Sequence, residues 1–204
     1  TPGFTKDRPM KATQTLPENY QPFARLNIED KRTQLILNIA GLVLLAVFGV
    51  LFFLWMAAFH SADFAAGIQF NLKIGQFLAA ILALIIVLVL HEGIHGLAYW
   101  LLAGVRPVFA FKGAYAYAAA PGWYVARGPY LAIGLAPLVL LSLAGMLALA
   151  VAPLSWLAVI YFAVVMNAAG AVGDLWVAVL LLRAPRGCLA LDSGEEIQLF
   201  APAA

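Results

Sequence analysis

Cysteine is nearly absent from this sequence, with Cys188 the only one among 204 residues. A single thiol excludes an internal disulfide and a metal site built from several cysteines. Charge is also scarce, because Asp, Glu, Lys and Arg together make up 11% of the chain and the formal net charge is only +2. So small a basic excess argues against a nucleic-acid partner.

The chain is instead rich in apolar residues. They make up 64% of the chain, well above the roughly 45–50% that is typical of soluble domains. Each of four apolar runs exceeds the roughly 20 residues that a helix needs to cross a bilayer. The runs cover Leu35–Phe59, Phe77–Leu102, Tyr130–Ala152 and Leu154–Leu182. We therefore expect an all-α polytopic membrane protein with four transmembrane helices, the last two forming a tight hairpin at Pro153.

The flanking segments are shorter and more polar. Residues 1–33 form a polar arm that contains prolines, unlike a cleavable signal peptide, whose apolar segment comes early. Residues 34–183 are expected to form the four-helix core, and residues 184–204 a short C-terminal tail. In that tail two apolar stretches flank Asp192-Ser193-Gly194, which predicts a small hairpin.

The segment between the second and third runs, residues 105–129, is too polar and too rich in Gly and Pro to cross the membrane. Its aromatic residues alternate with other residues, Phe109 with Phe111 and Tyr115 with Tyr117, as they do in short strands. This pattern predicts a short β-like hairpin, cytoplasmic or re-entrant. The hairpin either offers a strand edge to an extended peptide or merely packs against the helices.

The basic residues predict how the chain is oriented. Near the ends of the runs on one side are Arg25, Lys31, Arg32, Arg106, Lys112, Arg127, Arg183 and Arg186. The opposite side has only Lys73. Because cytoplasmic loops carry the excess of Lys and Arg, both termini and the segment 105–129 are expected in the cytoplasm.

The most informative stretch lies near the end of the second run and reads His91-Glu92-Gly93-Ile94-His95. Two histidines four residues apart share one face of a helix, so both side chains can bind one metal ion. The carboxylate of Glu92 is then free to take a proton from a water at that ion. Ionisable groups at membrane depth are costly, and they usually serve a function.

A catalytic zinc site needs a third protein ligand and keeps a further position open for water. The chain has ten acidic residues, and eight of them, Asp192 included, lie in tails or loops. Only Glu92 and Asp174 fall inside the apolar runs. Asp174, in the fourth run, is therefore the candidate for the missing ligand.

Depth in the membrane provides a check on that choice. His95 lies 11 residues before the basic marker Arg106, and Asp174 lies nine residues before Arg183. At about 1.5 Å per residue, the two side chains are within roughly 3 Å of the same level. The sequence therefore predicts one Zn²⁺ site formed by His91, His95 and Asp174.

Asn167 precedes Asp174 by seven residues, two turns along the same helical face. An unpaired amide in a membrane span is costly. It either donates a hydrogen bond to a substrate carbonyl or developing oxyanion, or pairs with a neighbouring helix, and the sequence leaves both roles open. Gly170 and Gly173, which lie between the two residues, allow close helix contact and ease a kink.

These motifs together resemble a known family. The segments 91–96 and 167–174 are similar to the bacterial zincin peptidases, which are catalogued as a domain of unknown function and are related to the site-2 type of intramembrane metalloprotease. Residues 111–117 and Leu135-Ala136-Pro137 are also typical of that family. The resemblance covers roughly residues 77–182. It implies zinc bound by His91, His95 and Asp174, with Glu92 as the general base.

The resemblance implies a zinc-dependent metalloprotease of the bacterial plasma membrane, cutting peptide bonds within or beside the bilayer. Its expected partners are the lipid bilayer and a membrane-protein or peptide substrate in extended form. The chain departs from site-2 proteases in two places, because the stretch from Asn167 to Asp174 has no proline and Leu175 stands where they have glycine. A non-catalytic metal-binding membrane protein is the main alternative. A metal transporter is less favoured, because no relay of polar residues crosses the rest of the bilayer.

Overall fold

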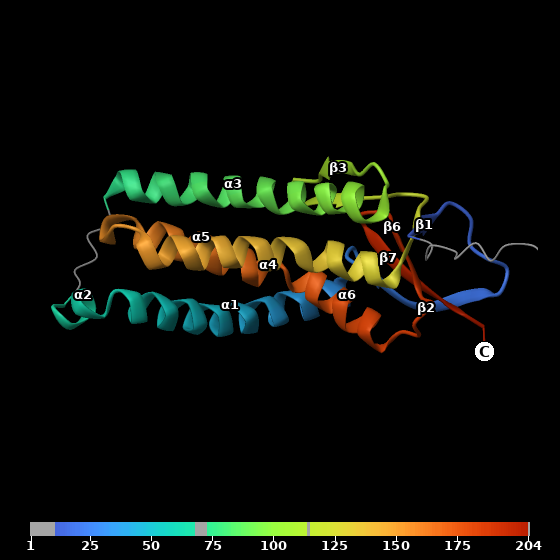
Figure 1. Ribbon diagram of the computed structural model, residues 1–204, viewed down its shortest axis with the longest axis horizontal. Coiled ribbons are helices and arrows are strands. Elements are labelled where there is room, and N and C mark those ends of the chain that lie inside the picture. The colour runs from blue at the N-terminus through green and yellow to red at the C-terminus, as the bar shows by residue number, and fades with distance from the viewer. Residues whose placement is uncertain (1–10, 68–72, 114, 204) are drawn as a thin grey trace, which may run out of the picture.

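A bundle of long helices carries a small β-sheet at one end in the computed structural model, which describes residues 11–67, 73–113 and 115–203 (Figure 1). The long helices are α1 (Lys31–Phe59), α3 (Ile74–Ala98), α4 (Arg127–Val151) and α5 (Leu154–Gly170). Two short helices, α2 (Ser61–Ala65) and α6 (Val172–Arg183), complete the set, and α3 continues as a π-helical turn, η1 (Tyr99–Ala103). Helices α4 and α5 lie between α1 and α3 and pack against both.

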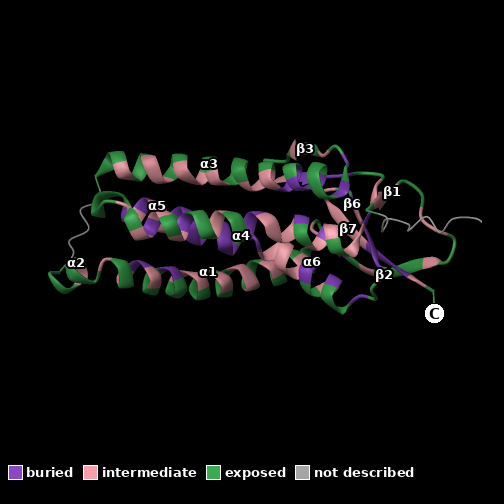
Figure 2. Cartoon of the chain, in the orientation of Figure 1, coloured by how far each residue is buried: buried purple, intermediate pink, exposed green. Residues whose placement is uncertain are grey.

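Three helices within the described residues are long and apolar enough to cross a membrane: Lys31–Phe59, Ile74–Ala103 and Arg127–Val151. The pair α5 and α6 would make a fourth crossing if it is counted as one span. The outer faces of these helices are exposed and apolar (Figure 2), and none of the most apolar 18-residue stretch of Ile74–Ala103 is buried. Lipid is the environment that such a surface requires.

The prediction of one continuous helix over Leu154–Leu182 is wrong, because the segment forms two helices, α5 and α6. The chain breaks at Ala171, and α5 and α6 meet at a bend of 40°. Gly170 and Gly173 flank the break, and glycine is a poor helix former that leaves the backbone free to turn. The bend places Asp174 in the first turn of α6.

A five-stranded antiparallel sheet at the end of the bundle corrects the all-α expectation. Its order is β1 (Ala12–Thr13), β5 (Tyr124–Ala126), β6 (Leu189–Asp192), β7 (Glu196–Pro202) and β2 (Tyr20–Asn27). Strands β6 and β7 form the C-terminal hairpin, and β2 from the N-terminal region pairs with β7. The sheet therefore brings the two ends of the described chain together (Figure 1).

A separate two-stranded ladder lies between η1 and α4. Strands β3 (Val108–Phe111) and β4 (Ala116–Ala119) pair antiparallel, with Val108 opposite Ala119. The ladder packs tightly on α3, since a Cβ atom at Gly96 would overlap the ring of Phe109. The absence of a side chain at Gly96 thus lets a strand approach the helix directly beside His95.

Candidate metal centre

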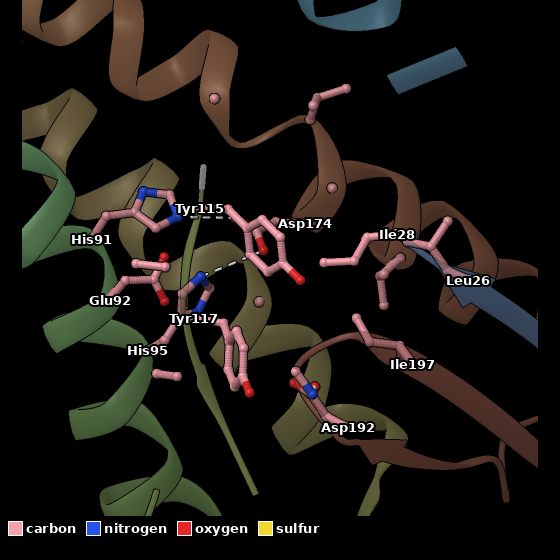
Figure 3. A pocket seen from close by; sticks show the side chains of 18 of the residues that line it. Leu26, Ile28, His91, Glu92, His95, Tyr115, Tyr117, Asp174, Asp192 and Ile197 are labelled. Atoms are coloured by element: carbon pink, nitrogen blue, oxygen red, sulfur yellow. Dashed lines mark hydrogen bonds and ion pairs between the residues drawn. The ribbon is translucent and has the colours of Figure 1, made fainter. Parts of the chain in front are cut away.

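Three predicted ligands from two helices converge in the structure. His91 and His95 lie one turn apart on α3, and Asp174 comes from α6 (Figure 3). The Nε2 atom of His91 is 3.2 Å from Oδ2 of Asp174, and the Nε2 atom of His95 is 3.4 Å from Oδ1. Each residue offers one ligand atom, and these atoms all lie within 4.8 Å of one another. The three side chains could therefore hold one metal ion.

The separations suit zinc. In a tetrahedral site with bonds of about 2.0–2.1 Å, neighbouring ligand atoms are about 3.3 Å apart. The two imidazole–carboxylate distances, 3.2 and 3.4 Å, are close to that value and end on different oxygens of Asp174, and the three ligand atoms as a set lie within 4.8 Å of one another. Two imidazoles and a carboxylate are also a common zinc donor set in catalytic sites, where the fourth position stays open.

The far side of each imidazole is held by a hydrogen bond. His91 donates from Nδ1 to Oδ1 of Asn167 on α5 at 3.0 Å. His95 donates from Nδ1 to the carbonyl oxygen of Ile133 on α4, also at 3.0 Å. Protons on both Nδ1 atoms leave both Nε2 atoms as the ligating nitrogens, which is how proteins usually orient histidine at a metal.

Asn167 was predicted to be either a donor to substrate or a helix–helix contact. In the structure its side-chain oxygen contacts a histidine of α3, so it joins two helices at the metal centre. Its Nδ2 atom is buried and has no hydrogen-bond partner among the described residues. A buried amide without an acceptor is costly. The side-chain oxygen thus supports His91, whereas Nδ2 is buried without an acceptor among the described residues.

Glu92 lies on the same helix, between the two histidines, and its carboxylate points into a cavity of about 550 Å³ (Figure 3). All three metal ligands line the same cavity. Strand β4 contributes Ala116, Tyr117 and Ala118 to the wall, and Tyr115, directly before the strand, lines it too. A carboxylate, the three candidate metal ligands and a strand therefore line one open cavity.

Sequence reasoning missed a second polar cluster on the wall of this cavity. The Oδ2 atom of Asp192 on β6 accepts a hydrogen bond from Tyr99 at 2.7 Å and another from Tyr130 at 3.0 Å. Its Oδ1 atom accepts from the backbone N–H of Gly194 at 2.8 Å. Burial raises the pKa of the Asp192 carboxyl group. The only signal in the sequence was Tyr99, four residues after His95 and hence on its helical face.

The turn after β6 also reaches the β3–β4 ladder. Lys112 pairs with Glu195 at 2.7 Å, a contact that raises the pKa of the Lys112 ammonium group. Gly194, with φ of 90°, lies so close to Tyr117 that a Cβ atom there would overlap the ring. The β3–β4 and β6–β7 hairpins thus contact each other at residues that line the cavity, Tyr117 and Gly194.

Comparison with known proteins places these features in a family. The family model described as "Putative zincin peptidase" matches residues 84–189, more than half of the 204-residue chain. The matched region contains both histidines, Glu92, Asn167, Asp174 and the β3–β4 ladder. No curated protein and no solved structure matches the chain. The chain therefore belongs to the family described as putative zincin peptidase.

Proposed function

We propose that this protein is a zinc-dependent peptidase that hydrolyses peptide bonds within or beside the membrane. The observation that carries the proposal is the convergence of His91, His95 and Asp174, from two helices, on a cavity that Glu92 also enters. The family description supports a zinc peptidase. Metal ligands from two spans are also the arrangement that the resemblance to site-2 proteases implies.

In this proposal, bound zinc supplies a Lewis acid that acidifies water and polarises a carbonyl group. Glu92 takes the proton of the attacking water and later delivers it to the leaving amine. Asn167 holds the ring of His91, and its buried Nδ2 donates to the carbonyl oxygen as negative charge develops there.

Strand β4 provides a means to present the substrate. Among the described strands it pairs only with β3, and residues 116–118 line the cavity that contains the metal ligands. A peptide in extended form can add to such an edge through main-chain hydrogen bonds. Pairing of this kind exposes the scissile carbonyl, which a helical peptide keeps within its own hydrogen bonds.

The site lies at the end of the bundle that carries the sheet (Figure 1). That end also holds most of the basic residues, which favours the cytoplasmic side of the membrane. We therefore place cleavage near the cytoplasmic surface of a plasma membrane, with both ends of the chain on the same side.

Substitution of the proposed base gives the direct test. Glu92→Gln keeps the size and shape of the side chain but cannot accept the water proton. The purified variant should retain zinc at the wild-type stoichiometry and lose at least about 100-fold in the rate of cleavage, in line with the usual contribution of a general base. Unstructured peptides with membrane-protein sequences serve as substrate, and released fragments are measured by mass spectrometry.

Two results would count against the proposal. Zinc-dependent cleavage that persists in Glu92→Gln would remove this residue from the mechanism. Zinc bound at full occupancy by a wild-type protein that cleaves no peptide would favour a structural metal site instead.

A further inference from the structure

We infer that the end of the cavity farthest from the histidines is a specificity pocket for a large apolar substrate side chain, within two residues of the scissile bond. The inference rests on the proposed peptidase function and names the substrate feature that the site selects. The walls of this pocket come from β2, β7 and α6. Its floor is formed by Asp192 with Tyr99 and Tyr130, here called the Asp192 cluster (Figure 3).

One row of the five-stranded sheet faces this end of the cavity. Leu26 on β2 is opposite Ile197 on β7, and Ile197 is opposite Asp192 on β6. Residues opposite each other in antiparallel strands have side chains on the same face of the sheet. All three line the cavity. Ile28, at the end of β2, extends the apolar wall.

The helices that carry the metal ligands also set the distance from metal to pocket. Tyr99 follows His95 by four residues, and Val177 follows Asp174 by three, so each lies about one turn, or 5.4 Å, further along. In an extended peptide, side chains on the same face are about 6.6 Å apart. A peptide whose carbonyl lies at the metal centre therefore places a nearby side chain in the pocket.

The chemistry of the floor favours an apolar occupant over a cationic one. Asp192 is 9% exposed, and both of its oxygens already accept hydrogen bonds. Two of the three donors are phenols that are themselves buried, at 1% exposed for Tyr99 and 4% for Tyr130. Leu26 and Val177 beside them are buried and apolar. A leucine or phenylalanine side chain gains by leaving water here, whereas a lysine would lose hydration for a carboxylate that is already paired.

Cleavage profiles of a mixed peptide library provide the test. Zinc-loaded wild-type protein should cut where a leucine, methionine or phenylalanine lies within two residues of the bond. Ile197→Phe fills the pocket and should lower kcat/KM for leucine-bearing peptides by about 10-fold or more, while alanine-bearing peptides change little. Ile197→Ala enlarges the pocket and should shift the preference towards tryptophan. Gln198→Ala changes the next residue of β7, whose side chain is on the opposite face of the sheet and does not line the cavity, and serves as the matched control.

Two outcomes would overturn the pocket. The profile of Ile197→Phe could equal that of the wild type, which would mean that no side chain enters at this residue. The wild type could instead prefer lysine or arginine and lose that preference in Asp192→Asn, which would make the site a cation pocket.

A binding measurement separates failure of the pocket from failure of the proposed function. Zinc-loaded Glu92→Gln should bind a leucine-bearing peptide at least about 10-fold more tightly than the same peptide with aspartate, and the added Ile197→Phe change should remove the difference. Such selectivity in a protein that cleaves nothing would keep the pocket and reject the peptidase. Cleavage by the wild type with no selectivity in either assay would keep the peptidase and reject the pocket.

Discussion

At the scale of single residues, the two histidines are held by different kinds of acceptor. His91 donates to the side chain of Asn167, whereas His95 donates to a main-chain carbonyl oxygen. A main-chain acceptor survives any substitution of Ile133, but the side-chain acceptor can be removed. The support of His91 is therefore the one that mutation can probe.

Removal of that acceptor should weaken zinc binding without removing a ligand. We expect Asn167→Ala to lower zinc affinity by about 10–100-fold, because the ring of His91 loses its fixed orientation. Asn167→Asp keeps an oxygen for the Nδ1 proton and should retain most of the affinity. Competition against a chromophoric chelator measures both variants. Equal affinity in wild type and Asn167→Ala would show that His91 does not depend on this contact.

The same pair of variants separates the two roles of Asn167. Aspartate preserves the acceptor but removes the amide N–H that is buried without a partner. If Nδ2 stabilises the oxyanion, Asn167→Asp should bind zinc yet cleave at least about 100-fold more slowly than wild type, comparable to loss of one oxyanion donor. Full activity in this variant would confine Asn167 to the support of His91.

Loss of the third ligand should be more severe. Asp174→Ala leaves two imidazoles and no anionic ligand, so zinc content after dialysis should fall from one per chain towards zero. Asp63→Ala is the matched control, since Asp63 lies in α2 and pairs with His60 rather than with the triad. Metal analysis of both purified variants decides the point. Full occupancy in Asp174→Ala would exclude this residue from the site.

At the scale of elements, the metal centre depends on how closely α4 and α5 pack. Gly145 on α4 lies against Val164 on α5, and a Cβ atom at Gly145 would overlap the valine side chain. Val164 is 6% exposed and branched at Cβ, so it has little room to move. One turn further along α5 is Asn167, which means that this contact sets the position of the acceptor for His91.

Gly145→Ala should therefore destabilise the bundle by about 1–3 kcal/mol, the usual cost of adding a methyl group to a filled interface. Gly128→Ala, on the same helix, faces no atom within 4 Å and should be neutral or stabilise by up to about 1 kcal/mol through helix propensity. Thermal unfolding in detergent compares the two. A Gly145→Ala protein as stable as Gly128→Ala would show that the helices separate without cost.

The convergence of His91, His95 and Asp174 could be predicted from the sequence because so few ionisable residues occur in the apolar runs. Spacing on one helix related His91 to His95, and depth in the membrane selected Asp174. The requirement that a ligand lie inside an apolar run excluded Asp192. Nothing in the sequence of the tail indicates that this residue is buried against the phenols of Tyr99 and Tyr130. Hydropathy also predicted a continuous fourth helix, since it measures apolar length and is insensitive to the backbone freedom that Gly170 and Gly173 supply.

The strands that pair over long range, β1 and β2 among them, were not predicted, for a different reason. β2 and β7 pair across nearly the whole chain, and β1 has only two residues, so their stability comes from partners that are remote in sequence. Local hairpins do leave a signal: the alternating aromatic residues indicate β3 and β4, and the turn at Asp192-Ser193-Gly194 indicates β6 and β7. Long-range pairing of this kind leaves little local signal.

At the scale of the whole molecule, the sheet determines where the chain ends can lie. Pairing of β2 with β7 holds the N-terminal region and the C-terminal strand at one end of the bundle, whereas α2 lies at the opposite end (Figure 1). If the long helices cross a membrane, the sheet, both ends of the described chain and the candidate metal centre share one side. The positive-inside rule predicts that this side, which carries most of the basic residues, is the cytoplasm.

Cysteine labelling tests this arrangement, since the native Cys188 is 1% exposed and should react slowly. Gln14→Cys places a thiol beside the sheet, and Ser61→Cys places one in α2 at the other end; both positions are exposed. A membrane-impermeant maleimide added to intact cells should label Ser61→Cys but not Gln14→Cys, and permeabilised cells should show both. The unsubstituted chain gives the background from Cys188. Labelling of Gln14→Cys but not of Ser61→Cys in intact cells would place the sheet outside and reverse the orientation. The same result for both variants in intact cells, either labelling or protection, would mean that both thiols lie on one side of the membrane. Helix α1, whose 29 residues lie between the two positions, would then not cross the bilayer.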